Sequence, residues 1–97
     1  MTRLIWSPRS VRDLESIREH IAQDSPLYAT LVLQRLVRAP ERLLDFPESG
    51  RVVPERSQNE LREIIVRPFR LVYRVGGDSV EVVTVFHASR LFPEIAE

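Results

Sequence analysis

The feature that most constrains the fold of this chain is a hairpin signal near its C-terminal end. From Arg70 to Phe86 the sequence is dense in apolar and β-branched residues, and Gly-Gly-Asp-Ser at 76–79 interrupts the run. Turn residues between two such segments predict a β-hairpin. A two-residue turn at Gly77 and Asp78 would fix its register. The predicted cross-strand pairs are Val75 with Val80, Arg74 with Glu81, Tyr73 with Val82, Val72 with Val83, Leu71 with Thr84 and Arg70 with Val85.

Alternation along the two strands sorts their side chains onto two faces. One face is apolar enough to lie under helices, whereas the other is mixed, and we expect any surface chemistry there. The apolar face is predicted to carry Phe69, Leu71, Tyr73, Val75, Val80, Val82, Thr84 and Phe86. The mixed face is predicted to carry Arg70, Val72, Arg74, Glu81, Val83, Val85 and His87.

Two helix starts precede the hairpin. A serine followed by a proline occurs at 7–8 and again at 25–26, which places a capping hydroxyl before a residue suited to the first helical turn. Apolar residues recur at helical spacing after each start, to about Gln23 in the first helix. The short connection predicts an antiparallel helical hairpin. In the second helix Pro40 should cause a kink or restart near Ala39, because proline lacks a backbone donor.

The remaining segments complete a single domain over residues 1–97. Residues 46–60 are polar and contain proline, and we predict a loop that crosses the sheet edge. The resulting order is β-α-α-β-β-β. This order favours an α+β fold in which the helical hairpin packs on one face of a mainly antiparallel four-stranded sheet. The predicted strands are 3–6, 61–66, 69–75 and 80–87.

Composition limits the classes of function. Fourteen basic and fourteen acidic residues give a formal net charge of zero, which weighs against a protein that holds nucleic acid by bulk electrostatics. All the basic residues are arginines, which bind phosphates or carboxylates well but are poor general bases. The chain has no cysteine, and its start lacks an apolar run long enough for a signal peptide or membrane span. We therefore expect a cytoplasmic protein that does not enter membranes.

No metal or other cofactor is expected. The two histidines, His20 and His87, are far apart in sequence and lack a matched pattern of carboxylates. The adjacent glycines at 76–77 belong to the hairpin turn, so they do not form a phosphate-binding loop.

Several short segments occur in an order that is typical of a known family: Ile5-Trp6-Ser7-Pro8, Asp13-Leu14, Phe46-Pro47, Gly50-Arg51, Leu61-Arg62-Glu63, Phe69 to Val75 and Val85 to Arg90. With this set, nearly the whole chain resembles the ParE/RelE superfamily of toxins from type II toxin-antitoxin systems. The resemblance implies the fold described above and a cognate antitoxin whose tail wraps the toxin. Pro40 departs from the uninterrupted second helix that is common in the family.

The resemblance leaves two targets open. RelE-like members cut mRNA on the ribosome, and ParE-like members act on DNA gyrase. For a nuclease, the resemblance assigns phosphate binding to Arg70 and Arg90 and makes His87 and Glu55 candidates for base and acid. Each also has a structural interpretation: Arg70 as an anchor or antitoxin contact, His87 as a strand end, and Arg90 and Glu55 as solvated residues. Leu61 and Glu63 stand where nuclease members have lysines.

The missing lysines and the zero net charge favour a ParE-like gyrase poison that acts by binding, without catalysis. The alternatives are a ribosome-dependent endoribonuclease and a degenerate member that only binds its antitoxin. We expect a hetero-oligomer with an antitoxin that folds on binding. Its predicted contacts are the exposed side of the first helix and the mixed sheet face, at Val72, Arg74, Val83 and Val85.

Overall fold

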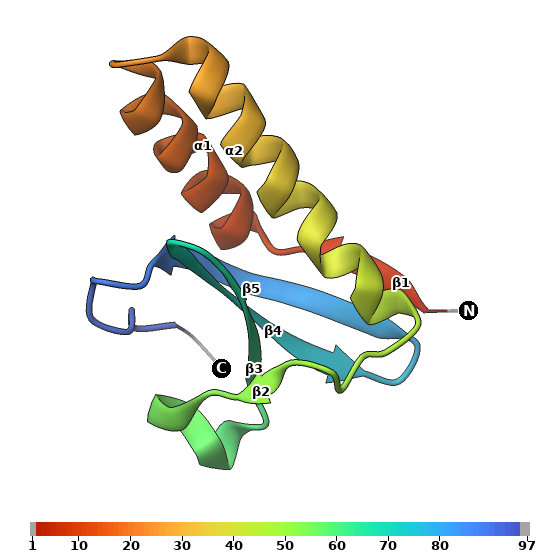
Figure 1. Cartoon of the computed structure of the whole chain (residues 1–97). Coiled ribbons are helices and arrows are strands. Elements are labelled where there is room, and N and C mark those ends of the chain that lie inside the picture. The colour runs from red at the N-terminus through yellow and green to blue at the C-terminus, as the bar shows by residue number, and fades with distance from the viewer. Residues whose placement is uncertain (1, 96–97) are drawn as a thin grey trace.

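The protein is a two-layer structure in which a helical hairpin covers one face of a five-stranded sheet (Figure 1). The computed structural model describes residues 2–95 and, at 57–59, the backbone alone. The helical elements are α1 (Pro8–Ala22), α2 (Pro26–Arg38) and the 3-10 helices η1 (Ala39–Leu44) and η2 (Pro54–Asn59). The strands are β1 (Arg3–Trp6), β2 (Arg51–Val52), β3 (Arg62–Val66), β4 (Phe69–Gly76) and β5 (Ser79–His87).

Both helices begin at the serines predicted from the sequence. The Ser7 hydroxyl accepts a hydrogen bond from the Ser10 N–H at 3.0 Å, and the Ser25 hydroxyl accepts one from the Tyr28 N–H at 3.1 Å. The predicted break near Pro40 is also confirmed, because α2 ends at Arg38 and the chain continues as η1. None of the described helices is long and apolar enough to cross a membrane.

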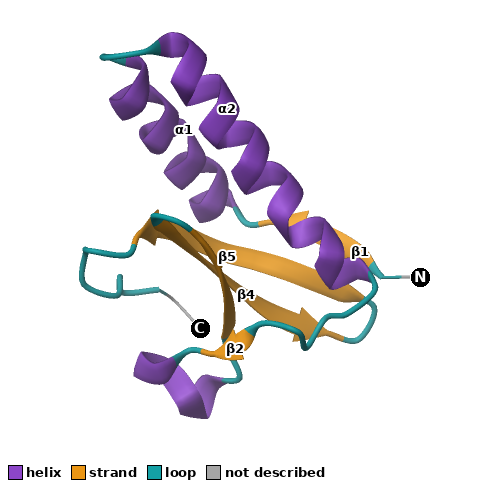
Figure 2. Ribbon diagram, viewed as in Figure 1, coloured by secondary structure: helices purple, strands orange, loops and turns teal. Residues whose placement is uncertain are grey.

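The sheet has one more strand than predicted (Figure 2). Its order is β1-β5-β4-β3-β2, with β1 parallel to β5 and the other neighbours antiparallel. The extra strand, β2, lies within the predicted loop, where Arg51 pairs with Glu63 and Val52 with Arg62. A two-residue strand is too short to produce the alternation from which strands are predicted.

A β-bulge in the hairpin corrects the predicted register. Tyr73 pairs with Val82 as predicted, but Val72 pairs with Thr84, so Val83 is an extra residue in β5. Every pair beyond this point differs from the prediction by one residue, and alternation then assigns the opposite faces. The observed pairs beyond the bulge are Leu71 with Val85, Arg70 with Phe86 and Phe69 with His87.

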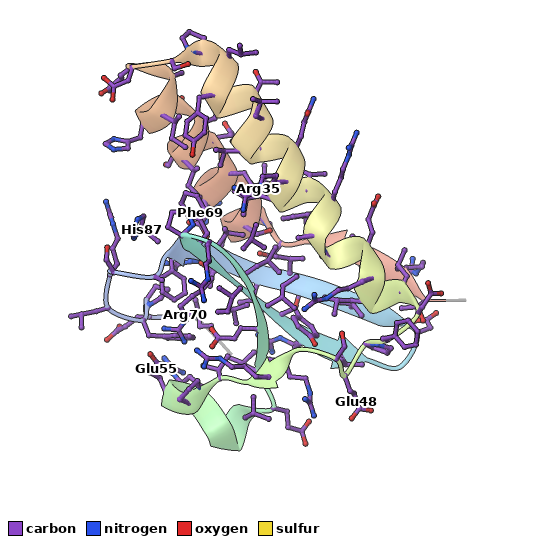
Figure 3. All side chains as sticks on the ribbon, viewed as in Figure 1. Arg35, Glu48, Glu55, Phe69, Arg70 and His87 are labelled. Carbon is purple, nitrogen blue, oxygen red and sulfur yellow. The ribbon has the colours of Figure 1, made fainter. Side chains whose placement is uncertain are left out.

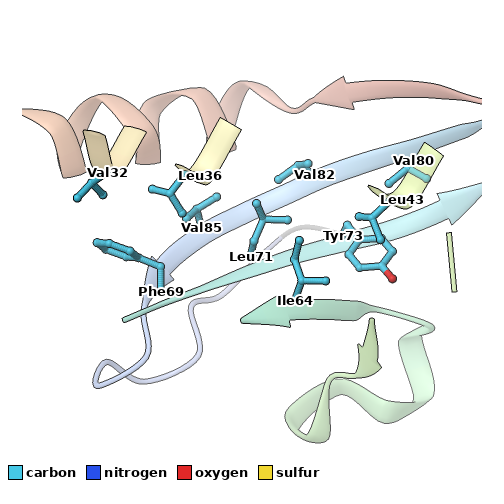
Figure 4. Close-up of a cluster of buried hydrophobic side chains, with 10 residues drawn as sticks. All are labelled: Val32, Leu36, Leu43, Ile64, Phe69, Leu71, Tyr73, Val80, Val82 and Val85. Carbon is cyan, nitrogen blue, oxygen red and sulfur yellow. The ribbon is translucent and has the colours of Figure 1, made fainter. Parts of the chain in front are cut away.

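Apolar side chains form one cluster on each face of the sheet. The helix-side cluster, shown in Figure 4, consists of Val32, Leu36, Leu43, Ile64, Phe69, Leu71, Tyr73, Val80, Val82 and Val85. The second cluster consists of Val53, Leu61, Val72, Val83, Phe86 and Ile95, with Phe92 packed against it. Val85 therefore lies under the helices and Phe86 on the other face, the reverse of the prediction for both residues.

Two polar residues of the α1 region bind β5 where β1 leaves the sheet. Beyond Trp6, the hydroxyl of Ser7 donates to the carbonyl of Val83 at 2.9 Å. One turn into α1, the Asp13 carboxylate accepts hydrogen bonds from the hydroxyl of Thr84 at 2.6 Å and from the N–H of Val85 at 3.0 Å. Beyond the end of β1, backbone groups of β5 thus form hydrogen bonds with Ser7 and Asp13 instead of with another strand.

Candidate functional site

Arg70 lies at the centre of a network of charged side chains on the sheet face opposite the helices. Its Nε donates to Oε1 of Glu63 at 2.6 Å. Its two terminal nitrogens donate to the two oxygens of Glu55, at 2.9 and 2.8 Å. Glu63 also accepts a hydrogen bond at 2.5 Å from Nε of Arg51, in the neighbouring strand β2. Two arginines and two carboxylates therefore form one neutral group, and Figure 3 shows Arg70 and Glu55 directed toward each other.

The network runs from the buried core to the surface, where the Arg51 side chain is 58% exposed. The Glu63 side chain is fully buried and that of Arg70 is 9% exposed, whereas that of Glu55 is 43% exposed. Hydrogen bonds from Arg70 lower the pKa of Glu55 from 4.5 to about 2, and those to Glu55 and Glu63 raise the pKa of Arg70. Glu55 and Arg70 thus both remain charged at neutral pH.

Aromatic rings enclose the same arginine. The Arg70 guanidinium carbon lies 5.1 Å from the centre of the Phe86 ring and 5.6 Å from that of Phe92. Arg56, next to Glu55 in η2, lies 5.6 Å from the same Phe92 ring. Cation–π contacts of this kind favour an arginine over the ring face. The C-terminal segment and η2 are therefore both held over β4 and β5 by Arg70.

His87 lies on the opposite face, at the end of β5. Its ring contacts Phe69 of the helix-side cluster edge to face, with 5.7 Å between ring centres. The N–H of Ser89 donates to Nδ1 of His87 at 3.1 Å, and the Ser89 hydroxyl lies 2.7 Å from the same atom. Nδ1 is therefore engaged in a local turn, and the N–H of Arg90 closes that turn on the carbonyl of His87 at 3.0 Å.

A cleft of about 680 Å³ lies beside His87, between the helical hairpin and the end of the sheet. We refer to it as the hairpin cleft. Its lining residues come from α1, α2, the β3–β4 turn, β5 and the segment after β5. They are Arg9, Asp13, Ser16, Ile17, His20, Ile21, Tyr28, Val32, Pro68, Phe69, Thr84, Val85, Phe86, His87, Ser89, Arg90, Leu91 and Pro93.

The structure divides the four residues that the resemblance assigned to a nuclease into two pairs. Arg70 and Glu55 are ion-paired under η2, and His87 and Arg90 line the hairpin cleft. The sequence prediction put Arg70 and His87 on one face. That expectation is wrong, because the bulge at Val83 moves His87 to the helix side.

The predicted mixed face is not open to solvent. Val72 and Val83 are buried in the second cluster beneath Val53, Leu61, Phe92 and Ile95, and Val85 is buried in the helix-side cluster. Of the four residues predicted to contact the antitoxin, only Arg74 is substantially exposed. It forms an ion pair with Glu81, its predicted cross-strand neighbour, at 3.5 Å.

Two important residues of the network were missed by sequence reasoning. Glu63 was noted only as a substitution for a lysine, although it is the buried partner of both Arg51 and Arg70. Phe92 lies beyond the last predicted strand, in a segment for which we predict no element. A signal for Glu63 existed, because a carboxylate in a predicted strand of apolar residues requires a cation nearby.

No metal site appears in the part of the chain that the structure describes. Residues 2–95 contain no group of three or more histidine, aspartate or glutamate side chains placed to hold an ion. The carboxylates of the network, Glu55 and Glu63, are instead paired with arginines.

A family model described as the ParE toxin of type II toxin-antitoxin system, parDE, matches residues 4–92. The chain belongs to this family. As a ParE toxin it is the toxin component of a type II toxin-antitoxin system, and the family implies an antitoxin partner. The ParE/RelE resemblance and the α+β fold predicted from the sequence are confirmed.

Two curated relatives cover almost the whole ParE toxin. "Toxin RelE2" of Caulobacter vibrioides is 37% identical over 92 residues, which are 94% of this chain and 100% of the relative. "Putative toxin Y4kP" of Sinorhizobium fredii is 35% identical over 95 residues, 96% of this chain and 95% of the relative. A solved structure of the chromosomal ParDE system from P. aeruginosa has a TM-score of 0.76 at 23% identity and covers 90% of this chain and 96% of that one. At this identity, the structure supports the fold alone.

Proposed function

We propose that this ParE toxin acts in the cytoplasm, where it poisons DNA gyrase by binding and cleaves no RNA. The observation that carries the proposal is that two carboxylates already occupy the guanidinium group of Arg70. Cleavage of RNA by its own 2′-hydroxyl needs a cation that is free to bind the phosphate. Here the Nε, Nη1 and Nη2 atoms of Arg70 all donate to carboxylates. This cation is thus committed to the fold.

The placement of the other candidate residues supports the same proposal. For RNA cleavage, the general base and the phosphate-binding cation must both reach the same phosphodiester of one substrate. His87 is on the helix side of the sheet and Arg70 is on the far side. Glu55, the other candidate acid or base, has a pKa of about 2, so it is a poor proton donor or acceptor at neutral pH.

The charge of the chain also favours a protein target. A toxin that sits among ribosomal phosphates benefits from an excess of basic residues. Here fourteen arginines are balanced by fourteen acidic residues, and Arg51 and Arg70 are neutralised within the network. A gyrase-binding surface has no such requirement.

The experiment is plasmid supercoiling by purified gyrase, with and without the toxin freed from its antitoxin. Loss of supercoiling together with gyrase-bound linear DNA is expected, and adding the antitoxin should reverse it. The matched reaction uses purified ribosomes and mRNA. Toxin-dependent cuts in ribosome-bound mRNA, combined with normal supercoiling, would overturn the proposal in favour of the endoribonuclease. If the folded toxin neither inhibits supercoiling nor causes cuts in mRNA, the non-toxic, antitoxin-binding alternative would be favoured.

A further inference from the structure

The segment that joins η1 to β2 holds a phenylalanine outside the core. The side chain of Phe46 is 67% exposed, and that of Leu44, two residues earlier, is 36% exposed. Neither side chain belongs to the two apolar clusters of the sheet. A single exposed leucine needs no explanation, but an exposed phenylalanine leaves a large apolar area in water. Phe46 is therefore available to a partner.

Hydrogen bonds on both sides of Phe46 fix the backbone that carries it. The N–H of Phe46 donates to the carbonyl of Arg42 at 3.0 Å, which closes a turn at the end of η1. The carbonyl of Phe46 accepts a hydrogen bond from the N–H of Ser49 at 3.1 Å, which closes a second turn. Between them Pro47 has its φ angle restricted by its own ring. The position of Phe46 is thus set by the turns before and after it.

The core of the protein anchors the same 46–50 segment. The hydroxyl of the fully buried Tyr73 donates to the carbonyl of Pro47 at 2.7 Å and accepts from the N–H of Gly50 at 2.9 Å. Nη1 of Arg62 donates to the carbonyls of Glu48 and Gly50, at 3.2 and 2.8 Å. A segment that is ordered before binding loses less conformational freedom when it binds. Aromatic side chains held in this way are typical of binding hot spots.

Carboxylates outnumber cations around Phe46. Residues 41–50 contain Glu41, Asp45 and Glu48 but only one basic residue, Arg42, and all four side chains are exposed. Glu48 forms an ion pair, whereas Glu41 and Asp45 form none within residues 2–95. A partner that surrounds an apolar pocket with cationic side chains is therefore complementary to this surface.

The 46–50 segment is remote from the hairpin cleft. Figure 3 shows Glu48 and His87, a residue that lines the cleft, toward opposite ends of the sheet. None of residues 41–50 lines the cleft. A protein bound at Phe46 and one bound in the cleft would thus contact different side chains of the toxin.

We propose that Phe46 is the side chain with which the toxin anchors itself to gyrase, with Asp45 and Glu48 facing cationic groups around the receiving pocket. An enzyme that holds DNA presents arginine and lysine side chains where the phosphates lie. An exposed aromatic ring with carboxylates beside it is complementary to such a surface. This inference rests on gyrase as the target in the proposed function and adds the toxin's point of contact.

The same carboxylates argue against two other partners for this surface. The phosphates of the DNA that gyrase holds carry the same sign of charge as Asp45 and Glu48, so direct binding of DNA is unfavourable. A second copy of the toxin would bring the carboxylates of both copies together, and like charges at an interface are also unfavourable. The contact is therefore with the gyrase protein.

The test compares the full-length toxin with four variants, in supercoiling by purified gyrase and in titration calorimetry with gyrase free of DNA. Two variants change the proposed contact: Phe46→Ser and Asp45→Lys. Two matched controls make similar changes elsewhere: Leu27→Ser, at a side chain that is 72% exposed on α2, and Asp24→Lys, at an exposed position between the two helices. All four side chains are exposed, so thermal unfolding should be nearly unchanged.

Phe46→Ser is expected to raise the Kd for gyrase and the half-inhibitory toxin concentration by about 10-fold or more, and Asp45→Lys by about threefold or more. Each control should change both quantities by less than about twofold. Equal effects of contact and control variants, while the unaltered toxin still inhibits, would overturn the anchor and leave gyrase as the target. No inhibition and no binding by the unaltered toxin would overturn the proposed function and the anchor together.

Two further measurements identify a different partner for the surface. Binding of the purified antitoxin by calorimetry should be the same for Phe46→Ser and the unaltered toxin. Loss of antitoxin binding in this variant, with inhibition of gyrase unchanged, would overturn the anchor in favour of an antitoxin contact. A toxin dimer that Phe46→Ser dissociates in analytical ultracentrifugation, again with unchanged inhibition, would overturn it in favour of self-association.

Discussion

Arg70 and Glu55 meet end to end, with Nη1 donating to Oε2 at 2.9 Å and Nη2 donating to Oε1 at 2.8 Å. Two parallel hydrogen bonds between a guanidinium and a carboxylate form one of the stronger polar contacts in proteins. Because Glu55 belongs to η2 and Arg70 to β4, the pair fixes the 54–59 segment on the sheet. The stability of this segment should therefore depend on the charge of Glu55.

Glu55→Gln should lower the free energy of unfolding near neutral pH by about 1 kcal/mol, a modest amount because solvent screens a half-exposed pair. The pKa of Glu55 is lowered from 4.5 to about 2 by its hydrogen bonds with Arg70. A carboxylate with a depressed folded-state pKa stabilises the protein fully above pH 4.5 and loses this contribution as the pH falls toward 2. Urea unfolding of both proteins across this range measures the difference, and a difference independent of pH would contradict the prediction.

Glu63→Gln should be much more destabilising, by about 3–5 kcal/mol, because it leaves Arg70 short of a buried counter-charge. The Glu63 side chain is fully buried and bonded to two arginines. Glu48→Gln is the matched control, since Glu48 is 77% exposed and lies 3.6 Å from Arg62. Its effect should stay within about 0.5 kcal/mol. Equal midpoints of urea unfolding for the two variants would show that the buried Glu63 contributes no more to stability than the exposed Glu48.

Gly50→Ala should destabilise the junction between the 46–50 segment and the sheet. An added Cβ would lie 2.6 Å from the Glu63 carbonyl oxygen and 2.6 Å from the Tyr73 hydroxyl. Contacts this short force the backbone to move, at a cost of about 1–3 kcal/mol. Gly77→Ala is the control, because a Cβ there meets no atom within 4 Å. Thermal unfolding of the pair tests the prediction, and an equal melting temperature would refute it.

Tyr73→Phe removes one hydroxyl that ties the same segment to β4. That hydroxyl donates to the Pro47 carbonyl at 2.7 Å and accepts from the Gly50 N–H at 2.9 Å. The buried N–H would lose its acceptor, so unfolding should become easier by about 1–3 kcal/mol. Hydrogen exchange should also speed up at Gly50 more than at the Ser10 amide, which the change does not touch. Unchanged exchange at Gly50 would mean that water replaces the hydroxyl.

The helices and main strands could be predicted because their signals are local. Ser7 and Ser25 cap their helices within three residues, and Pro40 acts on the turn that contains it. The parallel pairing of β1 with β5 joins residues more than seventy positions apart, and no local pattern encodes it. β2 similarly depends on its neighbour, because two residues form a strand only when β3 is present.

The candidate site was harder to predict because it depends on register. Residue identity and turn chemistry placed Tyr73 opposite Val82 correctly. At the bulge that follows, the Ser7 hydroxyl binds the carbonyl of Val83 itself, and the Asp13 carboxylate binds the N–H of Val85 just beyond it. These contacts come from α1, so the hairpin sequence alone cannot reveal which face His87 occupies.

Because Val83 is an extra residue in β5, every side chain after it lies on the face opposite to the one that simple alternation assigns. A relative whose β5 has the same length but no bulge would carry its strand-end histidine on the same face as the arginine of β4, and its apolar residues there would exchange sides. For a strand of this length, the presence or absence of the bulge therefore distinguishes two surfaces on the same fold: one that can bring a histidine and an arginine together, and one that separates them, as here. Locating the bulge in related toxins would thus sort them by which side chains share a face of the sheet.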